Sequence, residues 1–353
     1  MGLGRNRTLR LGMTCLAVWV LKGVSRPCIA QTSDGSAARQ AVGGRDALGA
    51  FPSSQPVRLD PGKISASGES PPRKRPIDGI RDNSFFIEEA YNQEPGVVQH
   101  IFTGRFGLDE RGTDRTRTWD LSFTQEWPFF SQQHQLSYTI PYAFIDPAGQ
   151  EHGSGLGDVL LNYRYQLVND EALGLAVSPR ISLILPSGDE DRGYGDGVVG
   201  YQFNLPVSQE LGDRVYANFN VGFTHLPDAS IRFSDGRGSN DADLWGFNLG
   251  GSVIWAVTED VNLLCEANWA SDDSLFERPS AGGRRILLER ERSQDVVISP
   301  GVRWAWNLPG DLQIVPGIAL PVGLSRDAID YGVFFYLSIE HPFMRDEADR
   351  DAK

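Results

Sequence analysis

From about residue 97 to residue 343, apolar residues recur at every second position, and the charged residues of each segment lie between them. In the segment 118–127, for example, one set alternates with the other: Trp119, Leu121, Phe123 and Trp127 against Asp120, Ser122, Thr124 and Glu126. A period of two is the strand period, because successive side chains of a strand point to opposite faces. The chain is therefore predicted to form β-strands that each have one apolar and one polar face.

About twelve segments follow this pattern, and most of them span ten residues or more. They are 97–106 (the weakest), 118–127, 134–144, 158–167, 173–185, 199–205, 215–224, 245–255, 261–269, 298–306, 312–320 and 331–340. Ten residues is the length that a tilted strand needs to cross the hydrocarbon layer of a membrane. No segment has a helical period, and none has the roughly 18 uncharged apolar residues of a spanning helix.

In the eleven segments from residue 118 onward, charged residues fall on the polar face only. They are Asp120, Glu126, Asp158, Arg164, Arg180, Glu266, Arg303 and Glu340. In a soluble sandwich the polar face would be the solvated outside. In a membrane barrel it would line the lumen, because an arginine or lysine on the lipid face costs about 2–4 kcal/mol at mid-depth. The eight residues are accordingly lumen-lining candidates.

The connections between segments decide between sandwich and barrel, because long and short connections alternate. Long connections at 145–156, 186–197 and 270–293 are separated by short ones such as 128–133 and 168–172. Bacterial barrels combine long extracellular loops with short periplasmic turns, whereas a sandwich has no reason to keep this alternation. The predicted fold is an all-β, antiparallel up-and-down transmembrane barrel of about 12 strands.

The N-terminus has the pattern of a secretory signal peptide. Arg5, Arg7 and Arg10 precede a short apolar core at 11–21, and small residues at 28 and 30, the −3 and −1 positions, predict cleavage after Ala30. Together with the barrel, an export signal predicts a location in the outer membrane of a Gram-negative cell. Outer-membrane lipid and the barrel-assembly machinery are the implied partners.

The sequence divides into four parts: a signal peptide (1–30), a disordered periplasmic linker (31–81), the barrel (82–343) and a polar tail (344–353). The linker is rich in Ser, Gly, Pro and charge and has no apolar period. The tail is a departure from barrels that stop at a terminal aromatic residue. With the signal removed, Cys265 is the one cysteine left, so no internal disulfide and no cysteine-rich zinc site is expected.

Acidic residues outnumber basic ones by 46 to 33, which gives a net charge of −13. Binding of nucleic acid requires a basic surface, so nucleic acid is excluded as a partner. The loop 189–196 is acidic, but its spacing matches no 12-residue calcium loop. Glu289 and Glu291, which alternate with Arg290 and Arg292, are interpreted as loop-surface charge. No metal and no cofactor is predicted.

The lumen of a twelve-stranded barrel has an intermediate width. Eight strands enclose only side chains, and sixteen enclose a water channel. Many inward positions hold small residues: Gly157, Ser178, Ser182, Gly200, Gly222, Gly250, Ser252, Ser299, Gly301 and Gly317. They favour a passage for small molecules. Inward charges of both signs would instead close the barrel if they paired, so a closed structural barrel is the alternative.

Three stretches resemble a family of outer-membrane barrels associated with the meta-pathway of phenol degradation. They are residues 85–100, residues 155–159 leading into 163–165, and residues 185–189 before a Gly-rich loop. The resemblance covers roughly residues 82–343. It implies transport, with uptake of aromatic or other small hydrophobic compounds as the expected role.

Some outer-membrane barrels are hydrolases with a site at the rim, which is the competing class of function. Such a site requires a nucleophile, a base and an orienting partner within hydrogen-bond reach. His152 and His225 fall in connections predicted to be extracellular, near Ser154 and Ser230 respectively. Neither forms a known nucleophile motif, and GxSxG is absent from the sequence. The chain is therefore predicted not to be an enzyme.

Overall fold

The computed structural model describes residues 80, 84–111, 114–146, 152–232, 239–279 and 286–343. The expected signal peptide (1–30), nearly all of the expected linker (31–81) and the polar tail (344–353) lie outside these ranges. No helix among the described residues is long and apolar enough to cross a membrane.

One continuous sheet contains all the described strands. They are β1 (Val97–Arg111), β2 (Asp114–Phe129), β3 (Ser131–Asp146), β4 (Gly153–Leu156), β5 (Val159–Tyr165), β6 (Val168–Asp170), β7 (Leu175–Val177), β8 (Arg180–Leu185), β9 (Gly200–Glu210), β10 (Val215–Arg232), β11 (Ser239–Thr258), β12 (Val261–Pro279), β13 (Ile286–Trp304), β14 (Trp306–Leu308), β15 (Leu312–Ala319), β16 (Val322–Gly323) and β17 (Tyr331–Pro342). A short 3₁₀ helix, η1 (Glu190–Arg192), lies between β8 and β9.

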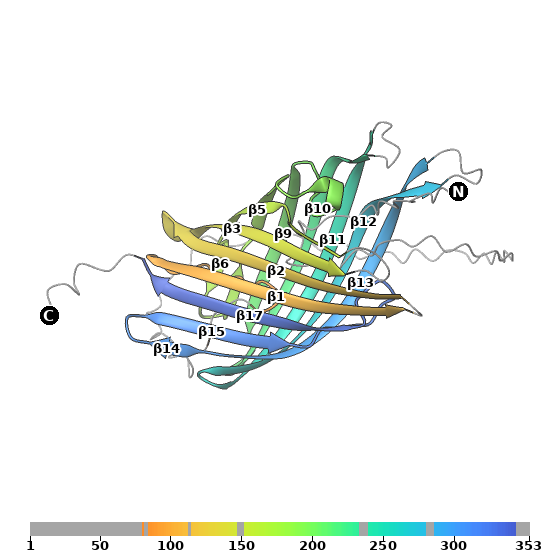
Figure 1. The fold of residues 1–353 in the computed structure, drawn as a ribbon. Helices are drawn as coiled ribbons and strands as arrows, with labels where there is room; N and C mark the ends of the chain where they lie inside the picture. The colour runs from red at the N-terminus through yellow and green to blue at the C-terminus, as the bar shows by residue number, and fades with distance from the viewer. Residues whose placement is uncertain are drawn as a thin grey trace, which may run out of the picture. The chain divides into compact units, whose positions relative to one another are not determined.

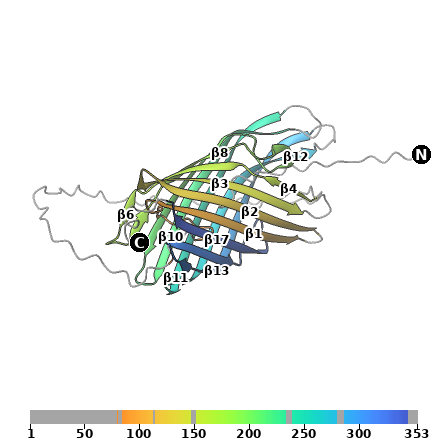
Figure 2. The same ribbon diagram turned by 60° about the vertical axis from the view of Figure 1, so that its left-hand side comes forward.

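The seventeen strand segments make twelve passes, because four passes are interrupted: β4–β5–β6, β7–β8, β13–β14 and β15–β16. Each pass pairs with the next in antiparallel register. β1 and β17 then pair from Val97 opposite Pro342 to Leu108 opposite Tyr331, which closes the sheet. Figures 1 and 2 show β1 between β2 and β17. The predicted twelve-stranded up-and-down transmembrane barrel is confirmed.

The apolar face of the sheet points outward and the polar face points into the barrel. On β10, Phe219 and Val221 are 56% and 49% exposed, whereas Asn218 and Asn220 are 1% exposed. A soluble sandwich would bury the apolar residues and expose the polar ones. The reverse arrangement is the one that a strand between lipid and a polar lumen requires.

The long connections at one end are partly strand, which differs from the sequence-based expectation. β10 and β11 continue to Arg232 and from Ser239, and β12 and β13 continue to Pro279 and from Ile286. Figure 1 shows the β12–β13 hairpin projecting beyond its neighbours at the upper right. Arg290 and Arg292 therefore lie on β13, not in a loop.

Histidine 225 lies in a strand as well. The connection 225–242, predicted to be a loop, is largely occupied by β10 and β11. The ring of His225 stacks on Trp245 of β11 at a centroid distance of 4.1 Å and an interplanar angle of 17°.

The barrel orientation can be tested by cysteine labelling. With Cys265 replaced by alanine, a cysteine at Asp189, which precedes η1, is expected to react with a membrane-impermeant maleimide on intact cells. A cysteine at Asn169 of β6, at the opposite end, is expected to react only after the outer membrane is permeabilised. Both side chains are exposed, so a difference in labelling would come only from the side of the membrane on which each cysteine lies. Equal labelling of both positions on intact cells would contradict the orientation.

Candidate functional site

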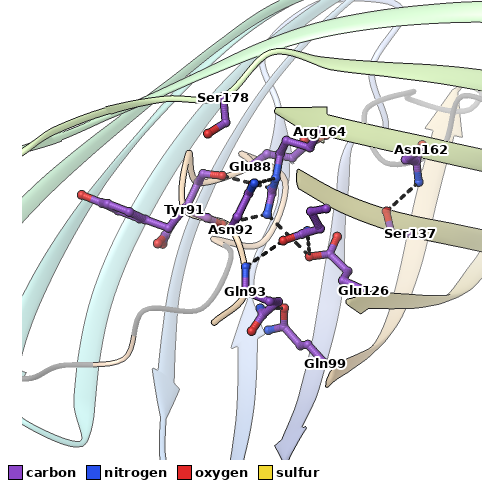
Figure 3. Close-up of polar contacts among 12 residues, drawn as sticks. Glu88, Tyr91, Asn92, Gln93, Gln99, Glu126, Ser137, Asn162, Arg164 and Ser178 are labelled. Carbon is purple, nitrogen blue, oxygen red and sulfur yellow. Dashed lines mark hydrogen bonds and ion pairs between the residues drawn. The ribbon is translucent and has the colours of Figure 1, made fainter. Parts of the chain in front are cut away.

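Residues 84–96, which precede β1, lie inside the barrel and are here termed the lumenal segment. Seven of its residues (Ser84, Phe85, Ile87, Glu89, Ala90, Asn92 and Gln93) are buried. Its backbone and side chains bond to inward-facing residues on strands from β3 round to β17. Figure 3 shows Arg164 pointing from β5 toward Tyr91 and Asn92 of this segment.

Glu266 of β12 holds the first turn of the lumenal segment. Its carboxylate accepts hydrogen bonds from the backbone N–H groups of Phe85 at 2.9 Å, Phe86 at 2.9 Å and Ile87 at 3.3 Å. Glu266 itself is 1% exposed. A single wall residue thus anchors three consecutive backbone groups.

Aromatic side chains of the segment pack against the wall. Phe85 lies 5.4 Å from Phe334 and 5.5 Å from Tyr336, measured between ring centroids. A β-carbon at Gly301 or Gly317 would lie 2.6 Å from the Phe85 ring. These two glycines were expected to leave an open lumen, but they leave room for Phe85 instead.

Ion pairs join two of the three acidic residues of the segment, Glu88 and Glu89, to the wall. Glu88 accepts hydrogen bonds from Arg180 Nη2 at 2.6 Å and Nε at 3.0 Å, and Glu89 pairs with Arg303 Nη2 at 3.2 Å. Burial acts to raise the pKa of Glu88, but Arg180, Arg164 and Asn204 together hold this pKa below its ordinary value. Glu88 is therefore ionised at neutral pH.

Arg164 holds the part of the segment that returns toward β1. Its Nε donates to Asn92 Oδ1 at 2.9 Å, its Nη1 to Glu89 O at 3.2 Å and its Nη2 to Tyr91 O at 2.8 Å. Glu126 lies 3.7 Å from the same guanidinium. Figure 3 shows Glu126 and Arg164 converging at this point.

The strand register places two arginines of the wall side by side, so the pair requires carboxylates from other parts of the chain. Arg164 of β5 and Arg180 of β8 are direct cross-strand partners. Like charges that face each other destabilise a strand pair unless a counter-ion lies between them. Glu126 and Glu88 supply the negative charge, and Glu88 comes from the lumenal segment. Both arginines were predicted from the strand period, whereas Glu88 and Glu89 were missed because their segment has no such period.

The remaining predicted residues lie elsewhere on the wall. Asp120 pairs with Arg105 of β1 at 3.1 Å, and Glu340 is half-buried on β17. Asp158 is fully buried and accepts from Gly188 N at 2.8 Å and Asp196 N at 2.7 Å. Asp158 thus fastens the connection between β8 and β9. Seven of the eight predicted residues are buried, and Glu340 is partly so.

A cavity of about 120 Å³ lies beside the tip of the lumenal segment. Phe85 and Phe86 line it from the segment, and Arg105, Asp120, Phe334 and Tyr336 line it from the wall. One side of the cavity is therefore aromatic, and the other carries a buried ion pair. The arrangement can hold a small molecule that has an apolar body and a polar edge.

No model of a known protein family matches the chain, and no curated protein sequence matches it. An outer-membrane channel from Pseudomonas putida F1 is similar in structure, with a TM-score of 0.52 at 11% identity over 71% of this chain and 97% of that one. The β domain of the Bordetella autotransporter BrkA has a TM-score of 0.44 at 15% identity, covering 71% and 100%. The NanC porin has a TM-score of 0.40 at 8% identity, covering 69% and 98%. The chain thus has the fold of outer-membrane β-barrels.

Proposed function

We propose that this protein is a channel of the outer membrane, and that the lumenal segment is its closure. The observation that carries this proposal is that inward-facing polar groups of the barrel wall find their hydrogen-bond partners in the lumenal segment. Glu266 and Arg164 bond mainly to residues 84–96, which belong to no strand of the barrel, and Arg180 bonds to Glu88 of the same segment. Removing this segment would leave the twelve passes and their pairing intact and would expose a polar, hydratable lumen.

The proposed solutes are small hydrophobic or aromatic compounds. Phe85, Phe86, Phe334 and Tyr336 offer ring faces to the cavity, which suits an aromatic body. An engineered apolar cavity of about 150 Å³ binds benzene, so a cavity of 120 Å³ suits a molecule near that size once the segment shifts. The resemblance to barrels of the phenol meta-pathway points to the same class of solute.

A reversible lock tests the channel. Ser84 Oγ of the segment lies 3.0 Å from Ser252 Oγ of β11, so cysteines at both positions are placed for a disulfide. With Cys265 replaced by alanine, the reduced protein is expected to conduct in planar bilayers, and phenol is expected to lower the current more than glucose does. Oxidation should abolish the current, and the Ser84→Cys variant alone should be insensitive to oxidation.

A closed structural barrel is the second candidate, favoured by the dense bonding of the lumenal segment. If neither the reduced nor the oxidised protein conducts, the result favours the closed structural barrel and contradicts the channel. Insertion by the barrel-assembly machinery is proposed for either function. The N–H of Phe343 donates to Gly96 O at 2.8 Å, and this hydrogen bond ties the end of the last strand to the start of the first.

A further inference from the structure

A groove lies on the outward face of the barrel, across β11, β12 and β13. Trp245, Phe247, Asp273, Arg290 and Arg292 line it. Trp245 N–H donates to Asp273 Oδ2 at 3.2 Å, and Asp273 stands opposite Arg292 in register, so the three residues adjoin across three strands. The groove is outside the lumen and independent of whether the lumen conducts.

The two arginines are held in place by a buried carboxylate. The side chain of Asp273 is 3% exposed and lies 2.9 Å from Arg292 Nε and 3.8 Å from Arg290 Nη1. Arg290 Nη1 also donates to Asp243 O at 3.4 Å, and Asp243 Oδ1 accepts from Asp228 N. Arg292 Cζ lies 5.5 Å above the centroid of the Phe247 ring, within cation–π range.

Both guanidinium groups nevertheless present donors outward. The side chains of Arg290 and Arg292 are 57% and 41% exposed. Arg292 bonds to Asp273 through Nε, and among the described residues its two terminal nitrogens have no hydrogen-bond partner. A guanidinium has five N–H donors in a planar fork that matches the oxygens of a phosphate.

The position of the groove at the border of the apolar band indicates what kind of ligand it binds. Below the arginines, the outward face of β13 continues with Val296 and Ile298, and that of β11 continues from Phe247 to Leu249. These residues belong to the apolar band that touches acyl chains, and Trp245 and Phe247 lie at its border, where aromatic girdles meet lipid headgroups. A basic pair at this border is expected to stand level with the phosphates of the surrounding lipid.

We propose that this groove binds the phosphate of an acylated membrane lipid. Arg290 and Arg292 hold the phosphate oxygens, Asp273 positions the two guanidinium groups, and the acyl chains lie along Trp245 and Phe247. A phosphorylated glycolipid of the outer leaflet satisfies both requirements.

Native mass spectrometry of the detergent-solubilised protein tests the site, with diphosphoryl lipid A as the probe. The Arg290→Gln/Arg292→Gln variant is expected to bind lipid A about tenfold more weakly than the unchanged protein, because two charge-assisted contacts are lost. The Arg192→Gln/Arg326→Gln variant removes two exposed arginines that lie outside the groove, and it should bind as the unchanged protein does. Each arginine is also replaced singly, in case the double variant does not fold.

Two further probes separate the lipid from its headgroup chemistry. Lipid A without phosphates is expected to bind the unchanged protein as weakly as diphosphoryl lipid A binds the double variant. Inorganic phosphate alone is expected not to be retained. Equal affinity of the double variant and the unchanged protein for diphosphoryl lipid A would overturn the proposal. So would equal binding of the dephosphorylated lipid, or retention of inorganic phosphate as strong as that of lipid A.

Discussion

Replacing Glu266 with alanine is expected to release the lumenal segment and to raise the conductance of the barrel. The carboxylate accepts from three consecutive backbone N–H groups, those of Phe85, Phe86 and Ile87. Each buried N–H left without an acceptor costs about 1–3 kcal/mol, less whatever water entering the space recovers. A total near 3 kcal/mol would make release about 100-fold more frequent, at about 1.4 kcal/mol for each factor of ten.

The measurement is the rate at which a cysteine at Ser84 reacts with a water-soluble maleimide, together with single-channel current. In the protein with Glu266 the Ser84 side chain is buried, so its labelling requires release. Both the labelling rate and the fraction of time spent conducting should rise when Glu266 is replaced.

The matched control is Asp120→Ala. Asp120 is also a buried inward carboxylate, but its ion pair is with Arg105 of the neighbouring strand β1. This control can change the conductance, but it should leave the labelling of Ser84→Cys unchanged. If Glu266→Ala labels no faster than the parent protein, Glu266 does not anchor the segment.

An arginine at Leu249 is expected to destabilise the folded barrel by about 2–4 kcal/mol. Leu249 is 54% exposed on β11 and lies between the outward residues Trp245 and Trp255, which mark the two borders of the apolar band. The new charge would therefore face acyl chains near mid-depth, where neither water nor a counter-ion reaches it. Urea unfolding from phosphatidylcholine vesicles measures the change in free energy.

Leu211→Arg is the matched control, because it makes the same substitution at an equally exposed leucine. Leu211 is 60% exposed and lies in the short connection between β9 and β10, outside the apolar band. A change within about 0.5 kcal/mol is expected there, as for ordinary surface substitutions. Equal destabilisation by both substitutions would show that lipid contact does not distinguish the two positions, and would contradict the membrane assignment of the outward face.

The sequence alone was sufficient to determine the number of strands that cross the membrane and their two faces, although not how far the strands extend at one end. Lipid imposes this pattern on every residue of a spanning strand, because a charge on the outer face costs several kilocalories per mole. Asp120, Arg164 and Arg303 could therefore be assigned to the inside of the barrel from the strand period, and they are buried there.

Only the tertiary structure decided what the inward residues do. Residues 84–96 have no periodicity because they contact the inward faces of many strands and do not themselves pair in the sheet. Gly301 and Gly317 look like open space in the sequence, and Phe85 fills that space. The pairing of Arg164 with Arg180 depends on strand register, and so does the pairing of Asp273 with Arg292. A period of two specifies the face on which a side chain lies, but strand register and barrel closure determine what it meets there.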